Sequence, residues 1–444
     1  MFWSRHMRID VYLPSGQCAS LSLPPDATVS ELKAAAQKHF NLYFLRLTLD
    51  GECLEIRKTL QDVGLNDGDM VSALVQAPKL AAGRWAKAFA LIDRKGTVLT
   101  WGHPGCGGDS SDVRGLLRNV LQVKASSGAR AALRADGRVV AWGEASLGGS
   151  SEEVQDILRN VKQIQSSERG FAAILEDGGV VSWGWAGDLN GIEDQLHDVE
   201  HLEASAAAFA ALRADGQVLC WGPQSMGGDA SAVQHQLKEV QQVCASNWAF
   251  AARRRDGSVV TWGDADLGGD SSQVQEQLRG VTCLKATAWA FAAIREDGSV
   301  VTWGDAMRGG DSSRVQAQLR SVQQIAATAN AFAAILADET VVTWGDQDSG
   351  GDSAAVRTEL RHVQHIAASN GAFAALRSDG SVVTWGDADY GGDSGDVQDQ
   401  LRHVQQIEAT DGAFAAIAGI GVVTWGFAPS GGDCRRIQKQ LMAL

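Results

Sequence analysis

Apolar and polar positions follow one order along most of the chain, and this order returns about every 40 residues. A short apolar run is followed by a second run, a tight turn, and a third run that ends in Trp-Gly. The tryptophans of this dipeptide are Trp101, Trp142, Trp183, Trp221, Trp262, Trp303, Trp344, Trp385 and Trp425. Their spacings are 41, 41, 38, 41, 41, 41, 41 and 40 residues. A fixed period of this size predicts a repeat architecture, in which each unit buries its apolar surface against its neighbours.

One unit, taken from residues 281–322, shows which strands the pattern predicts. Residues 281–286, 291–295 and 300–303 are rich in apolar and β-branched residues, which indicates three strands. Asp297-Gly298 separates the last two and is typical of a tight antiparallel turn, because both residues tolerate positive φ. The second strand reads Phe-Ala-Ala followed by Ile or Leu in most units. Its alanines leave room for neighbouring sheets, and we expect the phenylalanines and repeat tryptophans to fill the core between them.

A helix is predicted after each Trp-Gly. In the same unit Val315, Leu319 and Val322 fall at i, i+4 and i+7, which places them on one side of a short helix. Asp311 or Ser312 is the expected N-cap. Each unit is therefore predicted to be a three-stranded antiparallel sheet plus a short helix, which makes the chain mainly β.

The first 76 residues follow a different pattern. Residues 7–11 and 18–23 alternate in hydropathy around Pro14-Ser15-Gly16, which predicts a hairpin. Thr28 and Glu31 form a capping box at the start of a helix over residues 29–39. A strand over residues 45–49, a turn at Asp50-Gly51, a short segment over residues 60–65 and a strand over residues 70–75 complete the order.

This order resembles ubiquitin and its β-grasp fold. The residues that carry the resemblance are Leu32-Lys33, Arg46-Leu47, Gly51, Leu54, Thr59-Leu60, Val63-Gly64-Leu65 and Gly68-Asp69. The resemblance implies a ubiquitin-like domain over residues 1–78, followed by a repeat domain over residues 79–444. No Gly-Gly tail follows the last strand, so the module is expected to be fixed and not conjugated. The resemblance places Thr48, Ser72 and Leu74 on the face by which ubiquitin meets its receptors. A domain that only caps the array is the alternative.

The run Ala-Phe-Ala-Ala-Leu…Asp-Gly-Ser-Val-Val-Thr-Trp-Gly is similar to the repeat of the regulator of chromosome condensation family. That family forms seven-bladed β-propellers. Here the unit is shorter, close to that of the related β-lactamase inhibitory proteins, and there are nine units. The resemblance leaves two arrangements open, a propeller-like ring and an open spiral. No strand is left over to complete a shared blade, which slightly favours the spiral.

Charge and cysteine content narrow the classes of partner. The formal net charge of -14 argues against nucleic acid or an anionic membrane as the main partner, because both require a basic surface. The seven cysteines form no CxxC pair and do not recur with the repeat. They are interpreted as reduced thiols of an intracellular protein, in the cytoplasm or the nucleus. Residues 412–432 carry no charge but align with an ordinary repeat unit, so no membrane span is expected.

The sequence predicts no enzyme, metal site or cofactor. The loop over residues 264–270 has three aspartates at short spacing, yet the first of them is not kept in other units and no bidentate glutamate follows. No catalytic triad or phosphate-binding loop can be assigned.

Partner binding is instead expected where units diverge. Trp248 and Trp289 occupy equivalent positions in adjacent units, and the loop after Trp-Gly carries Trp185, Tyr390 and Phe427. Large aromatics outside the stacking pattern are good interface anchors, although drift with partial packing would also explain them.

These observations predict a monomeric, non-enzymatic scaffold that binds protein partners, with the ubiquitin-like part docking in a ubiquitin or proteasome pathway. Two alternatives remain open: an exchange factor for a small GTPase, and the substrate-binding part of a ubiquitin ligase. Exchange factors of the family insert a wedge between blades, and no insertion is expected here. Arg130 and Arg253 stand at core positions without an identified partner.

Overall fold

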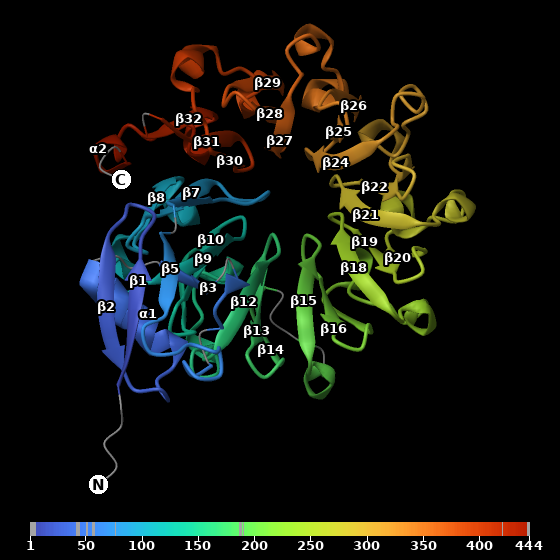
Figure 1. Cartoon of the computed structure of the whole chain (residues 1–444). Coiled ribbons are helices and arrows are strands. Elements are labelled where there is room, and N and C mark those ends of the chain that lie inside the picture. Colours follow the sequence, from blue (N-terminus) through green and yellow to red (C-terminus); the bar gives the residue numbers. More distant parts are fainter. Residues whose placement is uncertain are drawn as a thin grey trace.

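The computed structural model describes residues 6–40, 45–49, 52–55, 58–75, 77–185, 189, 191–419 and 421–441. These residues form one five-stranded sheet and nine three-stranded sheets. Figure 1 shows the nine small sheets arranged around a centre in chain order. Within the described residues, no helix is both long and apolar enough to cross a bilayer.

The first part is a β-grasp fold, as expected from the sequence. The strands β1 (Met7–Tyr12), β2 (Cys18–Leu23), β3 (Leu45–Leu49), β4 (Glu52–Cys53) and β5 (Met70–Val75) lie in the order β2-β1-β5-β3-β4. The central pair β1 and β5 is parallel. The helix α1 (Val29–Phe40) packs on this sheet, with Val29, Leu32 and Ala36 buried. The capping box is present, because Glu31 accepts the Thr28 N–H at 2.7 Å. Asp50-Gly51 lies outside the described residues.

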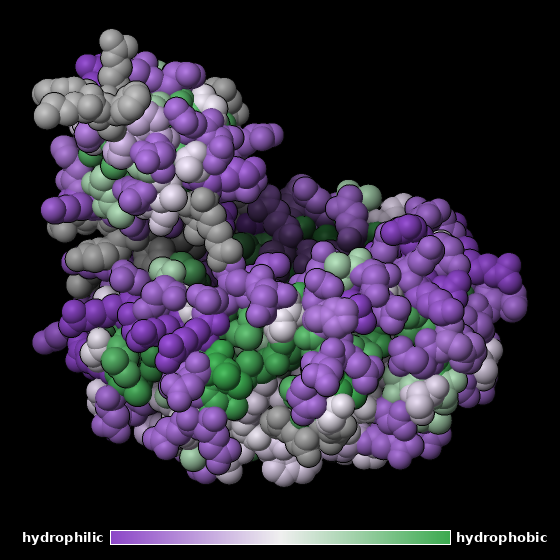
Figure 2. Space-filling view, turned by 90° about the horizontal axis from the view of Figure 1, so that it is seen from below, coloured by the Kyte–Doolittle hydropathy of each residue, from purple (hydrophilic) through white to green (hydrophobic). Residues whose placement is uncertain are grey.

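The core of this part is built from its own residues. Ile9, Val11, Leu32, Leu60 and Val71 are fully buried in one cluster that draws on residues 7 to 73. In Figure 2 this part projects from the array as a separate lobe.

Each remaining sheet contains three consecutive antiparallel strands and constitutes one unit. The first strands are β6 (Lys79–Ala81), β9 (Val120–Ala125), β12 (Val161–Ser166), β15 (Val199–Ala204), β18 (Val240–Ala245), β21 (Val281–Ala286), β24 (Val322–Ala327), β27 (Val363–Ala368) and β30 (Gln406–Ala409). The second strands are β7 (Ala88–Ile92), β10 (Ala129–Arg134), β13 (Gly170–Leu175), β16 (Phe209–Arg213), β19 (Ala249–Arg254), β22 (Ala290–Arg295), β25 (Ala331–Leu336), β28 (Ala372–Arg377) and β31 (Ala413–Ala418). The third strands are β8 (Val98–Gly102), β11 (Val139–Gly143), β14 (Val180–Gly184), β17 (Val218–Trp221), β20 (Val259–Gly263), β23 (Val300–Gly304), β26 (Val341–Gly345), β29 (Val382–Gly386) and β32 (Gly421–Gly426).

The helix expected after each Trp-Gly is reduced to short turns. In the sixth unit Ala306–Arg308 form a single 3-10 turn, and Val322 already begins β24. Its spacing from Leu319 therefore matched a helix by coincidence, because the chain changes from turn to strand between them. A short α-helix, α2 (Gln438–Leu441), follows the last unit.

Aromatic residues fill the space between units, as the repeat pattern predicted. Phe291 stacks on Trp303 with ring centroids 5.2 Å apart, and both are buried. The indole N–H of Trp303 donates to the carbonyl of Gly268 in the preceding unit at 3.0 Å. Only glycine fits there, because a Cβ on Gly268 would come within 2.5 Å of Phe291 and its φ is +100°.

The same contacts join the ninth unit to the first. The indole N–H of Trp101 donates to Gly431 at 3.1 Å. Gln406 accepts the N–H of Leu80 at 3.1 Å and donates to its carbonyl at 3.3 Å. Leu441 is buried beside Leu80 in the cluster that these two units share. Of the two arrangements expected, the structure therefore describes the ring, whose ends meet in a contact that sequence spacing could not reveal.

Candidate partner-binding surface

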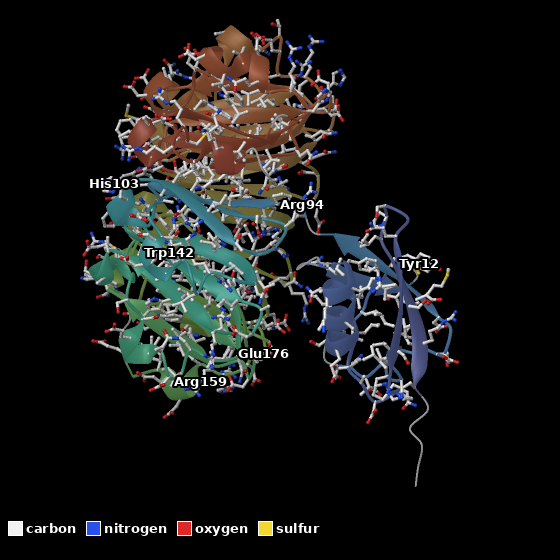
Figure 3. All side chains as sticks on the ribbon, turned by 90° about the vertical axis from the view of Figure 1, so that its left-hand side faces the viewer. Tyr12, Arg94, His103, Trp142, Arg159 and Glu176 are labelled. Atoms are coloured by element: carbon white, nitrogen blue, oxygen red, sulfur yellow. The ribbon has the colours of Figure 1, made fainter. Side chains whose placement is uncertain are left out.

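The loops of the array lie on two opposite faces of the ring. Because the strands of each sheet are antiparallel, the loop before the second strand and the loop after Trp-Gly share one end of the sheet. We call this end the loop face, and the opposite end, with the Asp-Gly turns, the turn face. In Figure 3 His103 marks the loop face, whereas Arg94 and Glu176 lie on the turn face, toward the β-grasp part.

The loop before the second strand is held in the same way in most units. In the sixth unit the Thr287 hydroxyl accepts the Ala290 N–H at 2.9 Å and donates to the Arg308 carbonyl at 3.1 Å. Ser246 accepts the Ala249 N–H at 3.0 Å in the fifth unit. A buried hydroxyl therefore fixes the loop, and the residue just before the second strand is presented at a defined place.

Trp248 and Trp289 occupy that place in the fifth and sixth units. Their rings are stacked, with centroids 6.1 Å apart and planes inclined by 29°. Both are half-buried. The guanidinium of Arg308 lies 4.3 Å from the Trp289 ring centroid, a cation–π contact that holds the indole in place. The two tryptophans thus form one apolar surface, which we call the Trp pair.

Neighbouring units show that stacking does not require tryptophan here. Ala207 stands at this position in the fourth unit, and Asn330 and Gly371 stand there in the seventh and eighth. Asn330 donates to the Ser349 hydroxyl at 3.1 Å. A Cβ on Gly371 would lie 3.0 Å from the ring of Tyr390, so this aromatic covers the loop of its own unit.

The other aromatic residues expected from the sequence lie on the same face but in other units. Trp185 is 53% exposed in the third unit, under the guanidinium of Arg169 at 4.9 Å. Tyr390 and Phe427, 40% and 52% exposed, belong to the eighth and ninth units. The structure thus joins Trp248 to Trp289 and leaves these three apart from the pair.

Two residues beside the Trp pair escaped the sequence analysis. Met307 is 82% exposed, and Arg308 follows it against Trp289. Met307 stands where the loops of the fifth, seventh and eighth units carry Asp266, Asp348 and Asp389. The replacement of an acidic residue by methionine was the signal in the sequence that could have identified this position.

The first unit carries an insertion, contrary to the sequence analysis. Leu80 pairs with Leu91 in the first unit, and Leu284 pairs with Ala293 at the equivalent place in the sixth. The phenylalanine of the second strand comes nine positions after Leu80 but only seven positions after Leu284. Two extra residues therefore lie in the loop over residues 82–87. The spacing of Trp-Gly does not reveal the insertion, because the first Trp-Gly comes only after this loop.

The longer loop brings Arg84 toward the inner strands. Burial lowers the pKa of Arg84 to about 10, against the opposing effect of Cys244, Glu168 and Glu203. These three belong to the fifth, third and fourth units, so Arg84 points into the ring. Its Nη2 is buried and has no hydrogen-bond partner among the described residues.

A series of backbone hydrogen bonds runs from unit to unit around the central opening of the ring, on the loop face, which we call the mouth. In the loop before the second strand of eight units, one N–H donates to the next unit, as in Asn247 to Ala288 at 3.0 Å and Ala288 to Ala329 at 2.9 Å. The series continues through Asp411, which donates to Ala86 at 2.9 Å. Ala86 itself donates to Gly83 within its own loop, so the series stops at the insertion.

The two core arginines have different surroundings. Arg130 is buried where eight units place phenylalanine, and its Nη2 donates to the carbonyl of Ala88. Its Nε and Nη1 are buried without a partner among the described residues. Arg253 lies nearer the surface and donates to Gln241 at 2.8 Å, which supplies the partner that the sequence did not identify.

On the β-grasp part, the three residues expected on the receptor face differ in exposure. Thr48 is buried and its hydroxyl donates to the Ser72 carbonyl at 3.4 Å. Ser72 and Leu74 are exposed. Tyr12 on the neighbouring strand β1 and Met70 on β5 itself are also exposed. Figure 3 shows Tyr12 on the side of this part away from the array.

Comparisons with known proteins give distant structural likenesses. No family model and no curated protein matches the chain. The CRINKLY WD40 ectodomain of the Arabidopsis thaliana receptor kinase ACR4 is 18% identical, with 59% of this chain and 95% of that chain covered and a TM-score of 0.37. The computationally designed Ika8 protein is 16% identical, with 70% and 93% covered and a TM-score of 0.35. Caldiarchaeum subterraneum ubiquitin is 28% identical, with 16% and 94% covered and a TM-score of 0.16.

Proposed function

We propose that the chain is a non-enzymatic scaffold whose array holds a protein partner on its loop face, with the Trp pair as the anchor. The observation that carries the proposal is the stacking of Trp248 on Trp289 at a position that Ala, Asn or Gly occupies in neighbouring units. Tryptophan and arginine are the residues that most often dominate binding energy at interfaces. Met307 and Arg308 extend the same surface, apolar beside cationic.

The β-grasp part would dock elsewhere. Its exposed residues Tyr12, Met70, Ser72 and Leu74 share one region of the sheet, since Tyr12 pairs with Ser72 and Asp10 with Met70. Because the fold is that of ubiquitin, we propose that this region binds a protein of a ubiquitin or proteasome pathway. Its residues differ from those of ubiquitin's receptor face, so the contacts would differ as well. A fixed cap on the array is the competing proposal.

The test of the Trp pair is a quantitative capture experiment with the full-length chain. The double variant Trp248→Ala, Trp289→Ala is expected to bind its partners more weakly, with a loss of binding free energy of more than about 2 kcal/mol, as is typical of a hot spot. Ile157→Ala is the control, because Ile157 is also a large apolar residue and 56% exposed, but lies in the second unit away from the Trp pair. Proteins kept by the control and lost by the double variant support the proposal. Equal capture by all three chains contradicts it.

Two alternatives follow from the resemblance to the regulator of chromosome condensation repeat. An exchange factor would accelerate nucleotide release from a small GTPase, and a release assay with the captured partner tests this. The substrate-binding part of a ubiquitin ligase would be captured together with a catalytic ligase protein. In both cases the same Trp-pair variant shows whether the loop face is used.

A further inference from the structure

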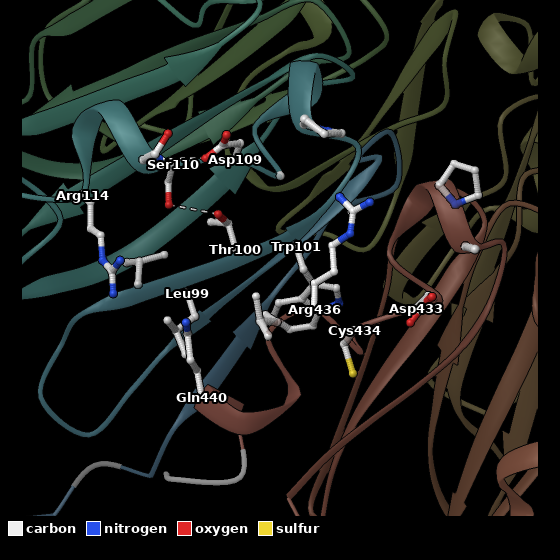
Figure 4. Close-up of a pocket in the computed structure, with 18 residues that line it drawn as sticks. Leu99, Thr100, Trp101, Asp109, Ser110, Arg114, Asp433, Cys434, Arg436 and Gln440 are labelled. Carbon is white, nitrogen blue, oxygen red and sulfur yellow. Dashed lines mark hydrogen bonds between the residues drawn. The ribbon is translucent and has the colours of Figure 1, made fainter.

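A groove of about 550 Å³ lies where the ninth unit meets the first (Figure 4). Its floor is the third strand of the first unit, β8, from Val98 to Gly102. One wall is formed by residues 108–114, which follow that strand, and the other by residues 433–440 of the C-terminal segment. We call it the seam groove. Its volume falls in the range of ligand-binding clefts.

The strand at the floor is an edge strand, because each unit orders its strands first, second, third. In five other units a glutamine closes this edge. Its Nε2 donates to the carbonyl of the first valine of the third strand, as in Gln275 to Val259 at 3.1 Å and Gln316 to Val300 at 2.9 Å. The remaining three pairs are Gln155 with Val139, Gln234 with Val218, and Gln398 with Val382.

Arginine replaces this glutamine in the first unit. Arg114 is exposed, and within the described part of the chain no side chain donates to the Val98 carbonyl in this way. Ser110 keeps the bond with Thr100 at 3.0 Å that the equivalent Ser271 forms with Thr261, but no glutamine stands beside it as Gln275 stands beside Ser271. The edge of β8 is therefore open at a carbonyl that a glutamine satisfies in five other units. An unpaired edge of this kind is a template for another extended chain.

The charges of the seam groove differ from those of comparable grooves. The groove between the first and second units has Asp109, Asp112 and Glu144 as its charged lining. The groove between the eighth and ninth units has Asp389, Asp393 and Asp396. The seam groove instead places two exposed arginines, Arg114 and Arg436, on its opposite walls.

Two carboxylates, Asp109 and Asp433, also line the seam groove, and each has a hydrogen-bond donor of its own. Asp109 accepts the Ser111 N–H at 2.9 Å. Asp433 is bonded to the guanidinium of Arg435 at 2.5 Å, which holds the pKa of its carboxyl at about 2. Among the described residues neither Arg114 nor Arg436 makes a hydrogen bond with a carboxylate of the groove. The groove thus offers guanidinium donors beside an open strand edge.

We propose that the seam groove binds an extended acidic segment of a protein partner, which adds as a fourth strand to the edge of β8. In an extended chain alternate side chains point the same way, so acidic residues at every second position would meet the arginine walls while the backbone pairs with β8. Charge-assisted bonds from guanidinium to carboxylate supply the selectivity. This inference rests on the proposed role as a protein-binding scaffold.

The probe for the test is a fluorescein-labelled peptide of alternating Glu and Val, measured by fluorescence anisotropy against the full-length chain. We expect it to bind and to weaken as salt is raised. A peptide with Lys in place of Glu should not bind, because its charges oppose the arginines. A peptide with Pro in place of Val should not bind either, because proline removes the N–H that β8 would pair with.

The decisive variant is Arg114→Gln, which removes the charge and restores the glutamine that closes the edge in other units. It is expected to weaken binding of the Glu-Val peptide by about tenfold or more. Arg357→Gln is the matched control, because Arg357 occupies the equivalent position in the seventh unit and donates to Gln318 at 3.5 Å. It should change binding by less than about twofold. Hydrogen exchange should show new protection of residues 98–102 with the bound peptide.

Three results would overturn the inference: no binding by the wild-type chain, equal binding of the Lys peptide, or unchanged binding after Arg114→Gln. These are separable from failure of the scaffold proposal. If the Trp pair captures partners while the Glu-Val peptide does not bind, only the seam groove fails. If the peptide binds as expected while the Trp-pair variant keeps every partner, only the Trp pair fails.

Discussion

The indole of Trp101 in the first unit donates to the carbonyl of Gly431 in the ninth, at 3.1 Å across 330 positions of sequence. Trp303 makes the equivalent bond to Gly268 in the preceding unit at 3.0 Å. The contact between the two ends of the array therefore has the geometry of an ordinary contact between neighbours. Within the described part of the chain, each unit therefore contacts a neighbouring unit on both of its sides.

Loss of a repeat tryptophan should therefore cost the same at the ends as in the middle. Trp101→Ala and Trp303→Ala are each expected to lower the free energy of unfolding by about 3–5 kcal/mol, through the cavity left beside the stacked phenylalanine. Urea denaturation of the full-length chain measures both. A small loss for Trp101→Ala with a large loss for Trp303→Ala would indicate an array with free ends.

The Trp pair should matter far less for stability than for binding. Trp248 and Trp289 are half-buried, and equivalent positions hold Ala207 or Gly371. The double change to alanine should cost less than Trp303→Ala in the same denaturation experiment. If the double variant unfolds while binding per folded molecule is unchanged, these tryptophans belong to the core.

Arg130→Phe should stabilise the chain. Burial lowers the pKa of Arg130 to about 9, which reflects the cost of holding its charge away from water. Phenylalanine restores the residue that eight units have, and exchange of a poorly compensated buried charge for an apolar side chain gains about 1–4 kcal/mol. Calorimetry or urea denaturation measures the change.

Arg253→Ile is the control for that substitution. Arg253 already has a partner in Gln241 and is only half-buried, so its replacement should change the free energy of unfolding much less. A loss of stability in Arg130→Phe would contradict the prediction and would show that the bond to Ala88 outweighs the burial of the charge.

Acid should weaken the array through its turns. At the turn between the second and third strands, four aspartates accept bonds from the hydroxyl and the N–H of a serine or threonine two residues later: Asp256, Asp297, Asp338 and Asp379. These bonds, the hydroxyl bond foremost, lower the pKa of each carboxyl. A lowered folded-state pKa contributes stability above the unfolded value of about 3.9, and this stability is lost as the pH falls through the folded value.

The urea midpoint should therefore fall as the pH is lowered from about 5 toward about 2. The control variant removes the four hydroxyls together, as Ser258→Ala, Ser299→Ala, Thr340→Ala and Ser381→Ala. Its midpoint should depend less steeply on pH. An identical slope in both chains would show that other carboxyls govern acid unfolding.

The β-grasp part should fold without the array. Its buried cluster draws only on residues between Met7 and Ala73. A fragment of residues 1–78 is expected to give a dispersed amide spectrum. A collapsed spectrum would show that the array supplies part of its stability.

Local patterns predicted local structure well. Asp297-Gly298 and Trp303-Gly304 delimited β23, and Thr28 with Glu31 located the start of α1, because these signals act between residues close in sequence. The stripe through Val315, Leu319 and Val322 misled, because a helix and a turn leading into a strand can give the same spacing of apolar residues.

Contacts between residues far apart in the chain could not be predicted from the sequence. The bond from Trp101 to Gly431 depends on the small rotation that each unit adds, summed over the whole array. The Trp pair was placed correctly because consecutive units lie side by side. Its cation–π partner Arg308 comes from a different loop, and only folding brings the two together.

The break in the backbone bonds around the mouth has a mechanical consequence. Asn247, Ala288 and their equivalents link each unit to the next, but Ala86 turns its N–H to Gly83 and gives none to the second unit. The series of backbone bonds around the ring is therefore interrupted at one boundary between units. A force or an entering partner that strains the ring therefore meets, between the first and second units, a boundary without this backbone bond, where Arg130 donates to the Ala88 carbonyl beside the loop that holds Arg84.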